Sequence, residues 1–137
     1  MFSHSTQYAI RAIEYLLVNS DKVNKSVVEL ATELHIPQPY LSKVMQQLAK
    51  NNIISSTKGR GGGFYLSDDN LKRPLIDIIV CMEGHNVFKQ CLLGLPHCSD
   101  ENPCLLHAHF KKFKKSIEMS ICDESIKELL NSTKGFN

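Results

Sequence analysis

Apolar residues recur at helical spacing in the first part of the chain and predict two amphipathic helices there. In the first helix they stand at i, i+3, i+4, i+7 and i+8, and the helix is expected to end near 19–21. The second helix is expected to begin after Ser26, because Glu29 three residues later completes the sequence pattern of a capping box. The two apolar faces consist of Ala9, Ala12, Ile13, Leu16 and Leu17, and of Val27, Leu30, Ala31 and Leu34.

A third amphipathic helix is predicted after a break at 35–37. Pro39 suits its first turn, because the N–H that proline lacks would have no partner there. The apolar stripe consists of Leu41, Val44, Met45 and Leu48, and the other positions are polar. These polar positions give the helix the face that a recognition helix needs, and they are Gln38, Tyr40, Ser42, Lys43, Gln46, Gln47 and Lys50.

A β-hairpin rich in glycine is predicted after the third helix. Residues 53–57 and 64–66 have the composition of strands, and four of the five residues at 59–63 are glycine. Glycine lets the backbone turn back and approach another surface closely, while Lys58 and Arg60 supply positive charge. Such a hairpin is the wing of a winged helix-turn-helix.

Two more helices, separated by a loop, are predicted in the second half of the chain. Pro74 opens a helix that Gly84 closes, with its apolar positions at Leu75, Ile76, Ile78, Ile79 and Met82. Residues 89–103 show no periodicity and contain glycine and proline, so we expect a loop there. A long helix is expected to begin near Cys104, followed by a short helix at 123–130 and a frayed end at 132–137.

The predicted long helix carries an apolar seam with spacings of four, three and four, formed by Leu106, Phe110, Phe113 and Ile117. This spacing is typical of helices that pack lengthwise against each other. Because no other long helix of the chain has this seam, we expect its partner to be its copy in a second subunit. The lysines at Lys111, Lys112, Lys114 and Lys115 would then cover the outer, solvated face.

The predicted fold class is mostly α with a small β-hairpin wing: a winged helix-turn-helix followed by a long C-terminal dimerisation helix. Residues 1–84 are expected to form the DNA-binding domain, 85–104 a cysteine-bearing loop, and 105–137 the dimerisation helix and tail. The 137 residues, 42% of them hydrophobic, suit one such small unit. No apolar run approaches the roughly 18 residues of a membrane span. The N-terminus lacks the pattern of an export signal, so the expected location is cytoplasmic.

The distribution of charge favours a nucleic-acid partner. The net charge is only +2, but residues 34–67 contain no Asp or Glu and four basic residues. A helix-turn-helix places its second helix in the major groove, while basic residues outside the groove fix its register on phosphates. Double-stranded DNA is therefore the expected partner. The candidate base contacts are Gln38, Tyr40, Ser42 and Lys43, and the candidate phosphate or minor-groove contacts are Lys58 and Arg60.

Three cysteines and a histidine form a candidate metal site in the predicted loop. Cys91, Cys98 and Cys104 are separated by six and then five residues, and His107 follows after two more. Thiolates on an irregular loop suit an iron–sulfur cluster, while a zinc site or a metal-free thiol switch remains open. The alternative histidine ligands are His109, His97 and His4, and the other two cysteines, Cys81 and Cys122, are expected in the core.

Together these features resemble the IscR/NsrR family of bacterial winged-helix transcriptional regulators, over about residues 1–131. The resemblance rests on Tyr8-Ala9, the run at 36–43, the wing at 58–66, Glu83-Gly84 and the cysteine loop. It implies a homodimer built on an antiparallel pair of long helices, with an iron–sulfur cluster that senses cluster supply, nitric oxide or redox state. It also implies that Cys91, Cys98 and Cys104 are ligands, with His107 as the fourth, and a 2Fe–2S cluster is favoured over a 4Fe–4S cluster.

Two positions depart from that family pattern. Some relatives take a carboxylate ligand from the first helix of the other subunit, but Gln7 stands at the matching position and is a poor ligand, which favours His107. Ser42 replaces a glutamate that helps the iron–sulfur assembly regulators select their sites, so their operator sequence does not carry over.

The expected function is regulation of transcription, with DNA affinity controlled by the cluster, and the alternative is the same fold without a cluster. A redox enzyme or electron carrier is the rival from another class. The chain has no nucleotide-binding glycine motif after a strand and no catalytic constellation beyond the candidate ligands, so an enzyme is not expected.

Overall fold

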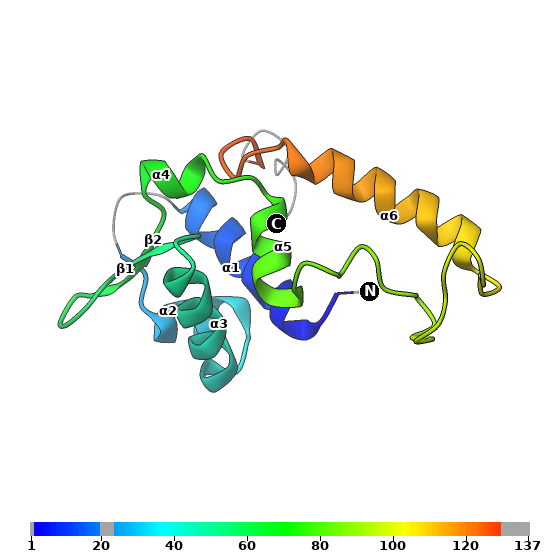
Figure 1. Ribbon diagram of the computed structural model, residues 1–137. Helices are drawn as coiled ribbons and strands as arrows, with labels where there is room; N and C mark the ends of the chain where they lie inside the picture. The colour runs from blue at the N-terminus through cyan, green and yellow to red at the C-terminus, as the bar shows by residue number, and fades with distance from the viewer. Residues whose placement is uncertain (1, 20–23, 130–137) are drawn as a thin grey trace.

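The computed structural model describes residues 2–19 and 24–129, and three helices of its N-terminal part surround one apolar core. These helices are α1 (His4–Val18), α2 (Val27–Leu34) and α3 (Gln38–Lys50), and α3 packs against both of the others (Figure 1). Every apolar position predicted for α1 and α3 is buried. The three predicted helices are therefore confirmed.

The start of α2 follows its prediction in part. Ser26 Oγ accepts a hydrogen bond of 3.1 Å from the Glu29 backbone N–H, as an N-cap residue should. The Glu29 carboxylate lies 3.6 Å from Lys25 Nζ instead of returning to the Ser26 backbone. An ion pair thus replaces the reciprocal half of the predicted capping box.

The wing consists of β1 (Ser55–Thr57) and β2 (Gly63–Tyr65), which pair antiparallel. Both strands differ in extent from their predictions. Ile53 and Ile54 were expected in the first strand, but each is only 1% exposed and belongs to the core. These two side chains anchor the base of the hairpin, and only the residues beyond them pair with β2.

The wing is also fastened to the chain that enters α2. Two backbone hydrogen bonds of 2.8 and 2.9 Å join Lys25 and Phe64. This contact is close at Gly63, where an added Cβ would lie 2.5 Å from the Lys25 carbonyl oxygen. Glycine is therefore required at this position for the hairpin to lie against α2.

Two short helices follow the wing, α4 (Asp68–Leu71) and α5 (Ile76–Glu83). The helix α4 was not predicted from the sequence, although Ser67 and Asn70 form a full capping box at its start. The side chain of Asn70 is buried and also bonds the Ser55 hydroxyl and the Asn52 carbonyl oxygen, so it joins α4 to the wing. The helix predicted after Pro74 is confirmed as α5, and Gly84 ends it.

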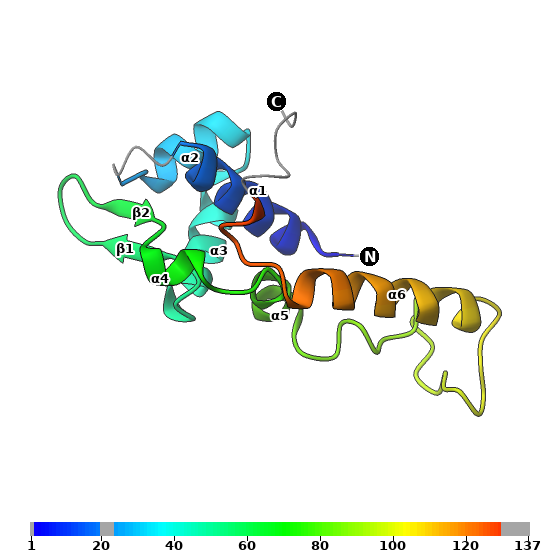
Figure 2. The same ribbon diagram turned by 90° about the horizontal axis from the view of Figure 1, so that it is seen from above.

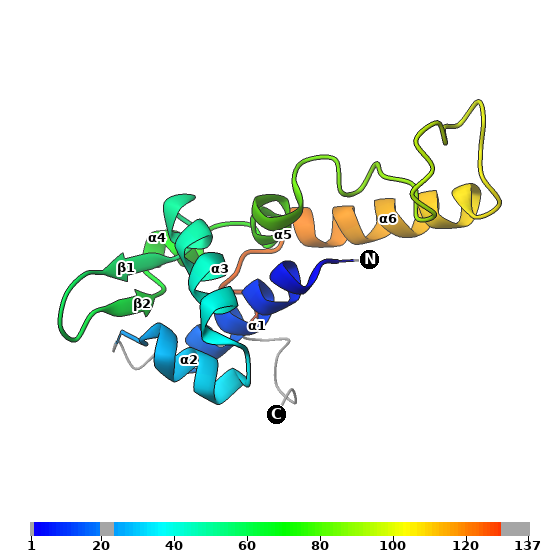
Figure 3. The same cartoon turned by 90° about the horizontal axis from the view of Figure 1, so that it is seen from below.

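The long helix α6 (His107–Cys122) extends away from the body formed by the other helices (Figure 1, Figure 3). Its C-terminal half contacts α5, because Ile117 and Ile121 pack against a small cluster that contains Ile79, Val87 and Phe88. No residue of α6 is buried. In the described residues, no helix is long and apolar enough to cross a membrane.

The short helix predicted at 123–130 does not begin at 123. Ser125 forms a bridge with Pro74, 126–128 form turns, and residue 129, the last that the structure describes here, is helical. The Ile126 N–H bonds the Arg73 carbonyl oxygen, and the Ile126 side chain is fully buried in the main core. The first residues of this segment therefore pair with the linker between α4 and α5. The predicted frayed end at 132–137 lies outside the described residues.

Candidate metal centre and nucleic-acid interface

The cysteine-bearing loop and the wing lie at opposite ends of the molecule (Figure 1, Figure 2). The loop leaves α5 at Gly84, runs along α6 and returns to the start of that helix at His107. Residues 89–103 contain no helix or strand, as predicted. The loop and the first turn of α6 therefore position the candidate ligands.

The loop brings three thiols together, and we refer to Cys91, Cys98 and Cys104 as the thiol cluster. Their Sγ atoms all lie within 4.8 Å of one another, although six and then five residues separate them in sequence. The Sγ atoms of Cys91 and Cys104 are 3.6 Å apart. All three side chains are half-buried and none is in a disulfide. Several soft donors thus face one small volume.

His107 is the histidine that contacts the thiol cluster. Its Nδ1 atom lies 3.1 Å from Cys98 Sγ, and its Nε2 atom lies 2.8 Å from Asp100 Oδ1. A backbone hydrogen bond from His107 N to Cys104 O, 3.1 Å long, forms the turn that sets this position. The alternative ligands are placed differently: His97 and His109 are exposed, and the ring of His4 packs edge-on against Tyr8 in α1.

The surroundings of the thiol cluster shift the pKa values of Cys91 and Cys98 in opposite directions. The backbone N–H of Leu95 bonds Cys91 and is the largest cause that lowers the pKa of this thiol to about 7, with help from Leu93 and the neighbouring thiols. The Cys104 N–H favours the thiolate of Cys98, but burial and the adjacent thiols outweigh it and raise the Cys98 pKa. One thiolate is therefore available near neutral pH without a metal.

The donor set fits a soft metal ion or an iron–sulfur cluster. Three thiolates and one imidazole match Cys3His zinc sites, and thiolates with histidine also hold iron–sulfur clusters. A cavity of about 260 Å³ lies against Cys98 and Cys104, while the space lined by Cys91, Cys104 and His107 measures about 10 Å³. Donor chemistry alone does not choose between these two groups.

Two lysines of α6 hold the loop, contrary to the prediction that all four cover a solvated face. Lys111 Nζ lies 2.7 Å from Asp100 Oδ2, and Lys114 Nζ donates to the Gln90 carbonyl oxygen. Both contacts reach from the helix to the loop beside it. Lys112 and Lys115 are exposed, as predicted.

The remaining cysteines are not equivalent. Cys81 is half-buried on α5 and packs against the main core, in agreement with its prediction, and burial raises its thiol pKa. Cys122 was expected in the core, but its side chain is exposed at the end of α6. The prediction for Cys122 is wrong because α6 packs on the body along one side only and leaves this thiol in solvent.

The predicted base-contacting residues share one exposed surface at the start of α3. Gln38, Tyr40 and Lys43 are exposed, with 64% of Tyr40 accessible, and Ser42 is half-buried. Lys58 and Arg60 are exposed in the turn of the wing. The wing and α3, which carry these six residues, lie at the end of the molecule away from the cysteine-bearing loop (Figure 1).

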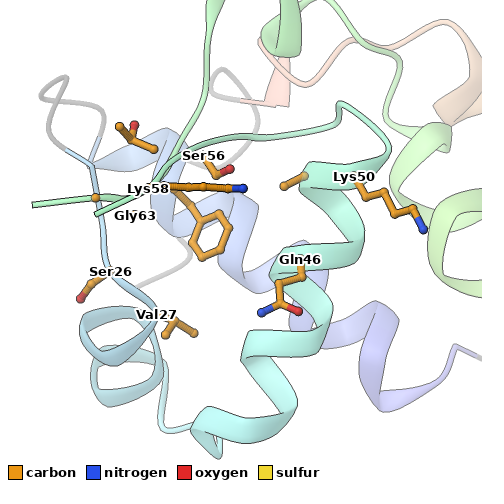
Figure 4. Close-up of a pocket in the computed structure, with 11 residues that line it drawn as sticks. Ser26, Val27, Gln46, Lys50, Ser56, Lys58 and Gly63 are labelled. Carbon is orange, nitrogen blue, oxygen red and sulfur yellow. The ribbon is translucent and has the colours of Figure 1, made fainter. Parts of the chain in front are cut away.

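A groove of about 660 Å³ separates α3 from the wing. Gln46 and Lys50 line it from α3, and Ser56 and Lys58 line it from the wing (Figure 4). Lys58 extends across the groove toward α3, and Lys50 points away from it. Gln46 and Lys50 were recognised as polar positions of the third helix but not as candidate contacts. The signal available in the sequence was their spacing of four residues, which places both on one polar side of the third helix.

Gln47 was predicted to lie on the polar face of the recognition helix, but its side chain bonds α5. Its Nε2 atom donates a hydrogen bond of 2.8 Å to the Cys81 carbonyl oxygen in α5. The side-chain amide of Gln47 is therefore used within the fold. This contact ties the recognition helix to the helix that leads into the cysteine loop.

The first half of α6 has an apolar surface that no other part of the described chain covers. Phe113 is 50% exposed and lies edge-on against Phe110. Met119, which is 65% exposed, lies in the second half of the helix and, six residues from Phe113, on a different side of it. Leu105, just before the helix, is 90% exposed. Of the predicted seam, Ile117 alone packs against the second hydrophobic cluster of its own chain.

Comparison with known proteins identifies the family. A family model described as Rrf2, iron-dependent transcriptional regulator, matches residues 2–132. The chain belongs to the Rrf2 family of transcriptional regulators. The predicted regulator family and the expectation of a regulator instead of an enzyme are thereby confirmed.

Individual relatives of this Rrf2-family chain support the assignment. A candidate HTH-type transcriptional regulator of Aquifex aeolicus is 37% identical over 134 residues, which cover 96% of this chain and 92% of the relative. The regulator IscR of Photorhabdus laumondii is 25% identical over 126 residues, or 92% of this chain and 76% of the relative.

Solved structures show the same fold at lower identity. The global cysteine regulator CymR of B. subtilis superposes with a TM-score of 0.73 at 17% identity, covering 97% of this chain and 98% of that one. IscR of T. potens superposes with a TM-score of 0.70 at 22% identity, covering 96% and 87%. The predicted winged helix-turn-helix is confirmed.

Proposed function

We propose that this chain is a homodimeric transcriptional regulator whose affinity for DNA depends on an iron–sulfur cluster. The cluster would be held by Cys91, Cys98, Cys104 and His107, with 2Fe–2S favoured over 4Fe–4S. The observation that carries the proposal is the convergence of three thiols within 4.8 Å, with His107 Nδ1 at 3.1 Å from one of them. The similarity to IscR proteins supports a cluster over a zinc ion.

In this proposal the DNA surface has two parts. Gln38, Tyr40, Ser42 and Lys43 contact bases in the major groove, while Lys58 and Arg60 contact phosphates or the minor groove. The groove between α3 and the wing, with Gln46 and Lys50, extends this surface toward the sugar-phosphate backbone. Residues 1–84 would thus supply the DNA contacts, 85–104 the ligand loop and 105–137 the dimer contacts.

The proposed dimer uses the apolar surface of α6. Phe113, on the predicted seam, is large and 50% exposed, and burial of such a side chain favours association. A second copy supplies a matching surface, because the same residues lie on its α6 helix. The dimer would also set the spacing of the two recognition helices, which a two-part operator requires.

Contacts at the end of α5 provide a route between the two sites. When bound, an iron–sulfur cluster supplies redox and ligand-exchange chemistry at the thiol cluster. The loop that carries these thiols begins directly after α5. Glu83 in the last turn of α5 bonds Thr6 of α1, and the Cys81 carbonyl oxygen accepts a bond from Gln47 of α3. A shift of the loop would therefore move α1 and α3 with it, and a difference in DNA fit between the two states would produce the switch.

The test is the visible absorption of protein purified without oxygen, with iron, sulfide and zinc measured on the same sample. We expect absorption in the region typical of thiolate-bound iron–sulfur clusters, with matching amounts of iron and sulfide. Cys98→Ala should lose this absorption, and Cys122→Ala, which changes an exposed thiol outside the site, should keep it. A colourless wild-type protein that still lacks iron after reconstitution would contradict the proposal.

A thiol switch is the second candidate, favoured by the distance of 3.6 Å between the sulfurs of Cys91 and Cys104. An oxidant such as a peroxide would remove two electrons and two protons from this pair and leave a disulfide. Loss of DNA binding on oxidation of metal-free protein, abolished by Cys104→Ser, would support this candidate over the cluster.

A further inference from the structure

The carboxylate of Asp100 links the candidate ligand His107 to the long helix. Asp100 Oδ1 lies 2.8 Å from His107 Nε2, and Asp100 Oδ2 lies 2.7 Å from Lys111 Nζ. The two carboxylate oxygens therefore have different partners, one on the ring that faces the thiol cluster and one on the next turn of α6.

This contact determines which nitrogen of His107 carries the proton. An ionised carboxylate can only accept hydrogen bonds, so the hydrogen between the two groups belongs to Nε2. In a neutral imidazole the other nitrogen is then unprotonated, and its lone pair is free to bind a metal. That nitrogen, Nδ1, is the one that lies 3.1 Å from Cys98 Sγ.

We propose that Asp100 is a positioning residue that holds His107 in the tautomer and orientation in which Nδ1 faces the thiol cluster. Lys111 supports this arrangement because it holds the second oxygen of Asp100 in place. Histidine ligands commonly donate their second N–H to a carboxylate, and this bond fixes the ring and increases the basicity of the ligand nitrogen. This inference rests on the proposed function for the identity of the group that His107 would bind. The hydrogen bond between Asp100 and His107 does not depend on that function.

The loop sequence gives Asp100 this position. Asp100 follows Cys98 by two residues, and the backbone bond of 3.2 Å from Ser99 N to Asn102 O turns the chain back toward Cys104. The carboxylate of Glu101 is also exposed, but it has no such contact with His107. Glu101 therefore offers a matched control with the same charge one residue away.

The first experiment uses reduced, metal-free protein with nitrogen-15 in its histidines. We expect the ring signals of His107 to show the Nε2–H tautomer in the wild type and in Glu101→Ala. Asp100→Ala should give a mixture of the two tautomers, while Asp100→Asn, which keeps a carbonyl oxygen as acceptor, should restore most of the wild-type pattern. An unchanged tautomer in Asp100→Ala would overturn the proposal.

The second experiment measures how well reconstituted protein keeps its cluster against a chelator. Loss of a carboxylate partner behind a histidine ligand typically weakens metal binding by about 10- to 100-fold. We expect a loss in this range for Asp100→Ala and little change for Glu101→Ala. Lys111→Met should show a smaller loss than Asp100→Ala, and Lys112→Met should show none.

The two experiments separate this inference from the proposed function. If the wild type holds no cluster but the tautomer responds to Asp100→Ala, the cluster proposal fails and the positioning role of Asp100 stands. If the wild type holds a cluster and Asp100→Ala retains it as well as Glu101→Ala does, Asp100 does not support the ligand, and the proposed function stands without it.

Discussion

Glu83 Oε1 accepts a hydrogen bond of 2.6 Å from the hydroxyl of Thr6, and this bond joins the last turn of α5 to the first turn of α1. Thr6 is fully buried, and the same carboxylate oxygen accepts a second bond of 2.6 Å from the Ser3 backbone N–H. The position where the chain leaves the helical body for the cysteine loop is therefore fixed by a charged acceptor.

Replacement of Glu83 should destabilise the fold and loosen the start of the loop. Glu83→Ala leaves the buried Thr6 hydroxyl without its carboxylate partner, which costs about 1 to 3 kcal/mol. Chemical denaturation followed by circular dichroism would measure this loss. Glu33→Ala, which removes an exposed carboxylate from α2, should leave the free energy of unfolding nearly unchanged.

The contribution of Glu83 should also depend on pH. Burial opposes ionisation of this carboxyl group, but the hydrogen bonds from Thr6 and Ser3 outweigh burial and lower its pKa. The ionised group therefore adds stability above its unfolded pKa of about 4.3, and this addition is lost as the pH falls through the lower, folded pKa. The difference in unfolding free energy between wild type and Glu83→Gln should be present at neutral pH and vanish in acid. A constant difference across this range would contradict the assignment.

In metal-free, reduced protein, Cys91 should be more reactive than Cys98. The Leu95 N–H is the main cause of its pKa of about 7, while the Cys98 pKa is raised. Since the thiolate is the reactive form, iodoacetamide should modify Cys91 before Cys98, with a rate that rises through about pH 7. Mass spectrometry of the modified peptides would measure both rates.

A backbone change tests the cause of this reactivity. Leu95→Pro removes the N–H that bonds Cys91 and should move the midpoint of its alkylation to higher pH. Leu95→Ala keeps the N–H and should behave as the wild type. Equal midpoints in the two variants would show that Leu95 does not control the acidity of Cys91.

The wing and the recognition helix should contribute differently to DNA binding. Replacement of Lys58 and Arg60 by alanine should weaken binding to all sequences and reduce the slope of log affinity against log salt by about 2 per subunit. Gln38→Ala should instead reduce discrimination between specific and random DNA, by about 1 to 3 kcal/mol if it reads one base. Fluorescence anisotropy over a range of salt concentrations would measure both effects. The matched control is Lys112→Ala on α6, and equal losses for all variants on both kinds of DNA would contradict this division.

Local sequence patterns predicted the helices and the wing because their apolar residues contact neighbours at fixed spacing. Leu41, Val44, Met45 and Leu48 are all buried, as a stripe on one helical face requires. Capping patterns predicted helix starts less well than apolar spacing did. The helix α4 was not predicted because its capping box has Asn70 at the position where Glu or Gln is usual. A four-residue helix is also too short to show periodicity.

The spacing of residues along the sequence could not predict contacts between distant segments of the chain. Ile126 enters the main core only because its backbone pairs with the linker before α5. The sequence identified the cysteines and His107, but it gave no measure of their separation in space. Asp100 and Lys111 looked like ordinary exposed charges, and their role depends on how the loop folds against α6.

The exposed apolar side of α6 should be the contact between two copies of the chain. Replacement of Phe113 by lysine puts a charge on each copy of a surface that the dimer would bury, and this opposes association. We expect a monomer by sedimentation, with an unchanged circular dichroism spectrum because Phe113 is 50% exposed and is not in the core. Met119→Lys, on a different side of the helix, should remain dimeric. Phe113→Leu, which keeps an apolar side chain, should remain dimeric. The Phe113→Lys variant should also lose most of its affinity for a two-part operator but keep weak, salt-dependent binding through the wing. A dimer that survives Phe113→Lys would place the interface elsewhere on the chain.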